Sequence, residues 1–321
     1  MPGYKAKTIK AVITKKINKW IESVDDTTVK ELLKSGVIVT GGCIVSMLQG
    51  EEVNDFDVYL RDKTTALAVA NYYVSKFKAT HPANMDFELY VEDTPDYLGV
   101  ERVKIVAKSV GIASDDGKSS TGEYKYFEAF PDEQGSAYIS RVMDNPEEIE
   151  DVHEDTSIEA KRVEPKGDFR PVFLSGNAIT LSDKIQIVLR FYGTPEEIHE
   201  NYDFVHCTSY WSNFNDKLVL NPAALECILS KELRYIGSKY PICSLVRLRK
   251  FITRGWRINA GQILKMAMQV SALDLTSVEV LADQLTGVDT AYFVQLIERL
   301  KEKDPERIDT AYLVEIVDRM F

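Results

Sequence analysis

Two aspartates stand two residues apart in the segment EEVNDFDVYL, whose apolar residues are typical of a β-strand. Side chains two apart on a strand point to the same face, so the carboxylates of Asp55 and Asp57 are expected to face one spot. Two like charges this close repel each other unless a cation lies between them. The pair therefore predicts a divalent metal site, with Mg²⁺ or Mn²⁺ as the cofactor.

A pair of glycines precedes the aspartates and separates a short apolar strand, GVIVT, from a short helix, CIVSMLQG. Glycines let the backbone approach a phosphate closely, and the N-terminus of the following helix offers unbonded N–H groups. We expect Gly41 and Gly42, helped by Ser46, to hold the phosphates of a nucleoside triphosphate.

A third acid, Asp203, lies in the apolar segment YDFVHC, which we interpret as another strand. An acid in such a segment lowers stability unless it is paired or bound to a metal, and for Asp203 alone a structural partner is an equally good explanation. Together with the glycine turn and the aspartate pair, however, it predicts a two-metal site for nucleotidyl transfer. One metal would activate the attacking hydroxyl and the other would hold the triphosphate, with Asp203 completing the site or acting as the base.

A basic run follows, because eight Lys and Arg residues and one acid lie between Lys231 and Arg257. Arg247, Lys250 and Arg254 are spaced i, i+3 and i+7, which places them on one face of a helix. This face is either a solvated surface or a surface that meets triphosphate or nucleic-acid phosphate, for which the arginine fork is well suited. The residues predicted to bind phosphate are Arg247, Arg249, Lys250 and Arg254.

These motifs resemble the polymerase-beta-like nucleotidyltransferase superfamily, and most closely the head of CCA-adding enzymes and bacterial poly(A) polymerases. GGCIVSMLQG, EEVN and DFD keep the spacing of that family's GG-x-V-R-D-x-L-L-G, four residues, D-x-D. NYDFVHCT resembles R-R-D-F-T-x-N-A, and KYPIC…RKF…RGWRI resembles E-D-P-x-R…R-F…L-G-F-x-I. The resemblance covers residues 35–70 and 195–260. It implies a metal-dependent transfer of a nucleotide monophosphate from an NTP to a hydroxyl, most directly an RNA 3′ end.

The sequence departs from that family at several functional positions. The arginine and aspartate that follow the family's glycines are Val45 and Ser46 here, and its paired arginines are Asn201 and Tyr202. The family's group that selects C and A falls on Lys239, Tyr240 and Cys243. The resemblance therefore implies the metal chemistry but not base selection or tRNA recognition. Segments such as IQIVLRF also resemble bacteriophage proteins.

The order of expected elements predicts an α+β protein, with a nucleotidyltransferase-like mixed sheet and flanking helices followed by an all-α domain. We place the catalytic head at residues 1–220, with an insertion at about 110–170 that contains an acidic run from Asp144 to Glu159, and the helical body at residues 221–321. Two similar segments near the C-terminus, GVDTAYFVQLIERL and RIDTAYLVEIVDRM, predict a duplicated helical unit that could dock a protein partner.

The composition argues against several classes of protein. A net charge of −11 argues against a protein coated in nucleic acid, and no segment approaches the roughly 20 apolar residues that span a bilayer. The four scattered cysteines are expected to be free thiols, and together with the lack of a signal peptide they predict a cytoplasmic protein. Two alternatives stay open: transfer to a protein or nucleotide acceptor, and a catalytically silent relative that serves as a binding or structural module.

Overall fold

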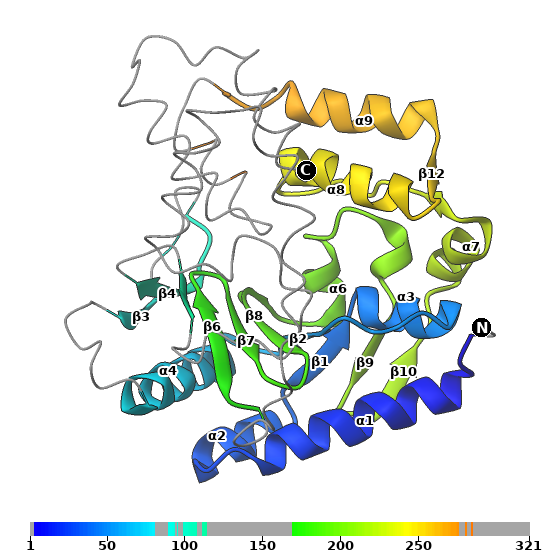
Figure 1. Cartoon of the computed structure of the whole chain (residues 1–321). Helices are drawn as coiled ribbons and strands as arrows, with labels where there is room; N and C mark the ends of the chain where they lie inside the picture. The colour runs from blue at the N-terminus through cyan, green and yellow to red at the C-terminus, as the bar shows by residue number, and fades with distance from the viewer. Residues whose placement is uncertain are drawn as a thin grey trace, which may run out of the picture.

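A central mixed β-sheet organises the chain in the computed structural model, which describes residues 3–80, 89–93, 95, 99–107, 111–113, 169–275, 280 and 284 (Figure 1). Its strand order is β10-β9-β1-β2-β8-β7-β6-β5, and β2 and β8 are its parallel pair. Its strands are β1 (Val37–Thr40), β2 (Phe56–Leu60), β5 (Gly111–Ala113), β6 (Pro171–Ser175), β7 (Ala178–Leu181), β8 (Ile185–Tyr192), β9 (Tyr210–Ser212) and β10 (Lys217–Val219).

In the residues that the structure describes, two small sheets accompany the central one. The antiparallel pair is β3 (Leu89–Asp93) with β4 (Val103–Ala107), and the parallel pair is β11 (Glu232–Leu233) with β12 (Arg257–Ile258). The helices are α1 (Ala6–Glu22), α2 (Thr27–Leu33), α3 (Gly42–Gln49), α4 (Lys63–Thr80), α6 (Pro195–His199), α7 (Pro222–Ser230), α8 (Pro241–Thr253) and α9 (Ala260–Val270), with a 3-10 turn η4 (Val205–Cys207).

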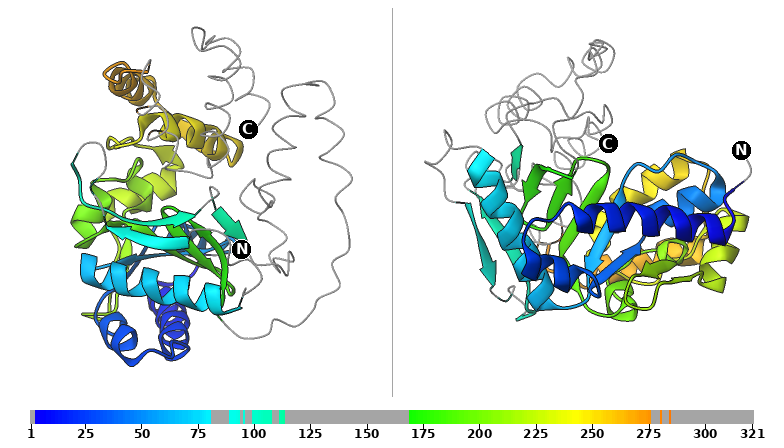
Figure 2. Two further views of the ribbon diagram at one scale, coloured as in Figure 1. Left: turned by 90° about the vertical axis from the view of Figure 1, so that its left-hand side faces the viewer. Right: turned by 90° about the horizontal axis from the view of Figure 1, so that it is seen from below.

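Helices α1, α2 and α4 cover one face of the sheet (Figures 1 and 2). Ile9, Ile13 and Ile17 recur every four residues along α1, so they form one apolar stripe, and all three are fully buried. The indole Nε1 of Trp20 at the end of this stripe donates a hydrogen bond of 2.7 Å to the hydroxyl of Tyr73 on α4. This face is the main hydrophobic core.

A second core joins the C-terminal helices to the sheet. Val45 on α3 and Phe204 beside η4 pack with Leu233, Leu248 and other buried side chains of the segment from α7 to α9. In Figure 1, α8 and α9 accordingly lie on the side of the sheet opposite α1. Because α3 contributes to both cores, the turn that precedes it is fixed from two sides. The domain boundary at residue 220 stays a prediction.

The mixed α/β architecture agrees with the sequence-based prediction, but two local interpretations were wrong. YDFVHC is not a strand: residues 205–207 form η4, and Phe204 makes only an isolated bridge with Tyr235, whereas the strand β9 begins after it at Tyr210. The segment after residue 221 is not all helical, because β11 and β12 pair within it. In both places the second core buries the apolar side chains. A short, continuous run of buried apolar residues shows neither the strand period nor the helix period, so periodicity cannot tell which element it forms.

Several predicted features lie outside the described residues, namely the acidic run, most of the insertion and the duplicated C-terminal unit. Cys43, Cys207, Cys227 and Cys243 are all free, as predicted. Among the helices that the structure describes, none combines the length and apolar character required to cross a bilayer.

Candidate active site

The glycine turn lies directly against Asp57. Strand β1 runs antiparallel to β2, which brings the end of β1 beside the start of β2. Gly41 has a φ of +93°, and a Cβ atom built on it would lie 2.9 Å from Oδ2 of Asp57 and 3.5 Å from the hydroxyl of Tyr202. Both the backbone conformation and the close contact therefore require glycine at this position.

Gly42 has the opposite surroundings. It is exposed, and apart from its own helix and chain neighbours no described heavy atom lies within 4 Å of a Cβ placed there. Helix α3 begins at this residue, and its N-cap, Gly41, supplies no side-chain hydrogen bond to the first N–H groups of the helix. Backbone donors at a helix N-terminus favour an anion such as phosphate.

Asp55 and Asp57 both lie close to the first turn of α3. Phe56 and Val58 point into the main core, so Asp57 between them points to the other face of the sheet, and Asp55 immediately precedes the strand. Burial raises the pKa of the Cys43 thiol, and the charges of Asp57 and then Asp55 raise it further. The structure thus brings the aspartate pair and the glycine turn together, as the spacing predicted.

A pair of tyrosines borders Asp57, and sequence reasoning gave it no role. The rings of Tyr59 and Tyr202 lie 6.0 Å apart between centroids. Burial raises the pKa of Tyr202 well above its usual value, and the neighbouring Tyr59 and Asp57 raise it further, so the phenol stays protonated. The signal in the sequence was the replacement of a family arginine by Tyr202, directly before Asp203.

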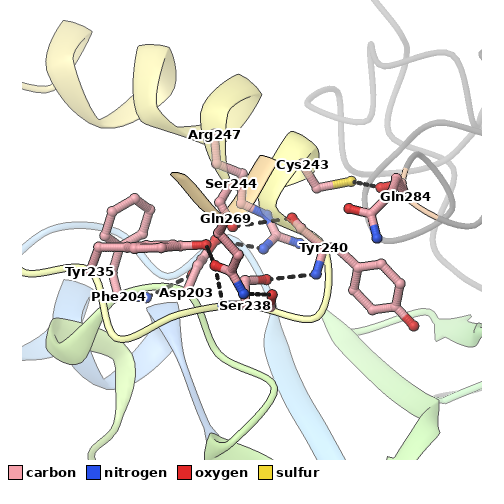
Figure 3. Close-up of polar contacts among 10 residues, drawn as sticks. All are labelled: Asp203, Phe204, Tyr235, Ser238, Tyr240, Cys243, Ser244, Arg247, Gln269 and Gln284. Atoms are coloured by element: carbon pink, nitrogen blue, oxygen red, sulfur yellow. Dashed lines mark hydrogen bonds and ion pairs between the residues drawn. The ribbon is translucent and has the colours of Figure 1, made fainter. Parts of the chain in front are cut away.

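Asp203 has a different partner from the one predicted. Its Oδ2 forms an ion pair with Nη1 of Arg247 on α8 at 2.7 Å, and its Oδ1 accepts a hydrogen bond of 3.0 Å from the backbone N–H of Phe204 (Figure 3). Burial opposes the charge of Arg247, but the Asp203 carboxylate raises the pKa of Arg247 above its usual value. Asp203 is only 7% exposed, whereas the side chain of Arg247 is 34% exposed, so the acid of this pair is shielded from water and the cation is partly solvated.

Asp203 therefore does not join Asp55 and Asp57 in a metal site of three acids. In the part of the chain that the structure describes, no three His, Cys, Asp or Glu side chains converge as a possible metal site. Asp55 and Asp57 remain the candidate ligands, and a metal role for Asp203 would require its ion pair to break.

The basic residues of α8 lie in two different environments. Arg247 turns toward Asp203 and is partly buried, whereas Arg249, Lys250 and Arg254 are exposed. Phosphate binding by those three residues stays a prediction, as does the contribution of Ser46, which lies in the second turn of α3.

Substitution of the two glycines by alanine is expected to have unequal effects. Gly41→Ala should lower the free energy of unfolding by roughly 1–3 kcal/mol, because alanine is strained at a positive φ and its Cβ would meet Asp57. Gly42→Ala serves as the matched control and should leave stability nearly unchanged, because its Cβ enters open space. Urea denaturation measures both, and an equal loss in the two variants would contradict this description of the turn.

Comparison with known proteins gives one family and several distant structures. A family model described as "Gabija anti-defense 2 family protein" matches residues 11–231. The curated protein "Gabija anti-defense 2" of Bacillus phage SPbetaL7 is 23% identical over 123 residues, which are 38% of this chain and 31% of that protein.

Among solved structures, the Thermotoga maritima CCA-adding enzyme in complex with tRNA has a TM-score of 0.35 at 12% identity. A tRNA-processing enzyme with CTP has the same TM-score at 11% identity. Each comparison covers 92% of this chain and 57% of the other, so the chain spans little more than half the length of these enzymes.

Proposed function

The chain belongs to the Gabija anti-defense 2 family. We therefore propose that it counters the defence named Gabija, and that it does so as a metal-dependent nucleotidyltransferase. It would transfer a nucleotide monophosphate from an NTP to a hydroxyl, most directly at an RNA 3′ end, and release pyrophosphate. One observation carries this proposal: the Gly41 turn lies against Asp57, and the helix that follows begins at the exposed Gly42, where an added Cβ would meet no described atom. The helix N-terminus that would bind phosphate and the acids that would hold the metal therefore lie side by side.

The two aspartates are a suitable donor set for Mg²⁺. This ion is commonly held by one or two carboxylates together with substrate phosphates and water, so a third protein acid is not required. When bound, Mg²⁺ would neutralise charge on the phosphates. Asp55 and Asp57 would hold the ion, and the N–H groups that follow Gly41 would bind the outer phosphates of the NTP.

The test is to incubate the protein with each labelled NTP and Mg²⁺ or Mn²⁺ in the presence of total RNA and protein. Label in RNA would support the proposed acceptor, and label in protein or in a small molecule would move the proposal to that acceptor. Absence of label from every fraction, with active enzyme preparations as positive controls, would overturn nucleotidyl transfer.

A second candidate is a binding module without catalysis. It is favoured by the Asp203–Arg247 ion pair, which engages the third predicted acid. Thermal unfolding separates the two candidates from a protein with no nucleotide site at all. An NTP with Mg²⁺ at a hundred times its dissociation constant should stabilise either candidate by about 2.7 kcal/mol, whereas label transfer is expected only of the enzyme.

A further inference from the structure

The last residue of β1 is held by several hydrogen bonds directly before the glycine turn. Thr40 is fully buried, and its Oγ1 lies 2.8 Å from Nε2 of His199 on α6. The same hydroxyl donates toward the backbone carbonyls of Ser209, at 3.0 Å, and Cys207, at 3.3 Å. Strand β1, helix α6 and the segment from η4 to β9 therefore meet at one side chain, next to Gly41.

The protons of this group follow from its acceptors. The two carbonyls can only accept, so they share the single proton of the Thr40 hydroxyl. We therefore assign the proton between Thr40 and His199 to Nε2 of the imidazole, which donates it to Oγ1. Burial lowers the pKa of His199 to about 4, with Glu196 acting in the opposite direction, so the ring is neutral at pH 7. The Thr40–His199 pair accordingly carries no net charge.

Thr40 faces the same side of the sheet as Asp57. The register of β1 and β2 pairs Val39 with Val58. Continued by one residue, this register places Thr40 opposite Asp57, and opposite residues have Cβ atoms roughly 5 Å apart. Both valines point into the main core, so Thr40 and Asp57 both point to the other face. Thr40 is therefore the cross-strand neighbour of a predicted metal ligand.

Tyr202 connects the same pair to the turn. Its ring lies 4.9 Å from the ring of His199 between centroids, and its hydroxyl lies 3.5 Å from the place of a Cβ on Gly41. Oδ2 of Asp57 lies 2.9 Å from that same place. The imidazole is therefore in contact both with Thr40 and with an aromatic ring whose hydroxyl borders the turn.

Helix α6 gives the imidazole a defined direction. It begins with a capping box: the Thr194 hydroxyl accepts from the N–H of Glu197 at 3.3 Å, and the Glu197 carboxylate accepts from the N–H of Thr194 at 2.7 Å. Pro195 follows at the first helical position, where its fixed φ favours the helix. His199 is the last residue of this short, doubly capped turn, so the direction of its side chain is fixed by local bonds.

We propose that His199, acting through Thr40, is a positioning residue of the nucleotide site: their hydrogen bond fixes the end of β1, and with it the direction of the glycine turn and the surroundings of Asp57. Neither side chain would touch the triphosphate. The role rests on the proposed function, because it is defined by the binding of an NTP with Mg²⁺. Hydrogen bonds that hold the groups behind a metal site typically contribute about 10–100-fold to metal affinity or activity.

The experiment measures the affinity of the folded protein for ATP with Mg²⁺, by equilibrium dialysis of labelled ATP. Thr40→Val keeps the shape of the side chain and removes the hydroxyl, and His199→Phe keeps a ring and removes the N–H donor. Each has a conservative counterpart, because Thr40→Ser keeps a hydroxyl and His199→Gln keeps an N–H donor. The matched control is Thr65→Val: Thr65 on α4 is also fully buried, and its hydroxyl lies 3.0 Å from both carboxylate oxygens of Asp62.

Thr40→Val and His199→Phe should each raise the dissociation constant for ATP with Mg²⁺ about tenfold. The double variant should bind no more weakly than either single one, because both changes remove the same bond. Thr40→Ser, His199→Gln and the control should bind nearly as the unmodified protein does, although the control loses stability. If Thr40→Val does not fold, His199→Phe gives the answer, because His199 is partly exposed.

Two results would overturn the positioning role. One is equal ATP affinity in the control and in the variants that lack the hydroxyl or the N–H donor. The other is an equal loss of affinity in the conservative variants, because the hydrogen bond would then not be the cause.

Label transfer separates this role from the proposed function. If the unmodified protein binds ATP with Mg²⁺ but transfers no label, the transferase fails while the positioning of a nucleotide site stands. If it transfers label and Thr40→Val and His199→Phe bind ATP equally well, the proposed function stands and the positioning role fails. Absence of ATP binding by the unmodified protein would reject both.

Discussion

Asp57→Asn is expected to reduce nucleotidyl transfer by several orders of magnitude and to leave the fold intact. Asparagine keeps the shape of the side chain but removes one of the two charges that would hold Mg²⁺, so the stabilisation by Mg²⁺ with NTP should also be lost. The metal-free protein should melt at the same or a slightly higher temperature, because repulsion with Asp55 is relieved. Label-transfer kinetics and thermal unfolding with and without Mg²⁺ measure these effects.

The matched control for this variant is Glu51→Gln, which removes an exposed acid that lies six residues away. It should change neither transfer nor the response to Mg²⁺. A purely structural aspartate pair would behave differently: Asp57→Asn would then lower stability by roughly 1–3 kcal/mol whatever the metal and keep the nucleotide response. That combination would reject the metal site.

Arg247→Met should lower the free energy of unfolding by about 3–5 kcal/mol. The change leaves the Asp203 carboxylate buried without the cation that lies 2.7 Å away, and an uncompensated buried charge is strongly destabilising. Arg249→Met is the control on the same helix. Its side chain is exposed, so its effect should stay within about 0.5 kcal/mol.

Urea denaturation of Arg247→Met, Asp203→Asn and the double variant then gives the coupling energy between the two side chains. A large coupling would identify the pair as the polar link between α8 and the segment before η4. If Arg247→Met instead kept full stability and lost nucleotide binding, Arg247 would act on phosphate, as the sequence alone had suggested.

The aspartate pair and the glycine turn could be predicted because their information is local. Gly41 and Asp57 lie on consecutive elements, and strand alternation alone is enough to point Asp57 away from the core. The apolar stripe of α1, whose isoleucines recur every four positions, is likewise a local pattern. These parts of the fold can be predicted without knowing which distant residues they contact.

The partner of Asp203 could not be predicted in the same way. Arg247 follows 44 residues later on a helix whose three similarly spaced cations all fitted a solvated or phosphate-binding face. In the structure, tertiary packing turns Arg247 toward a buried acid, whereas Lys250 and Arg254 are exposed.

The pairing of β5 with β6 has a consequence for how this chain can change over generations. Residues 114–170 connect these two neighbouring strands, and the strands nearest Asp57 lie further inside the sheet. A change in the number of residues between β5 and β6 therefore leaves β1 and β2 with the same neighbours, so related chains can diverge in length at this edge of the sheet while the acidic pair and its glycine turn stay in place.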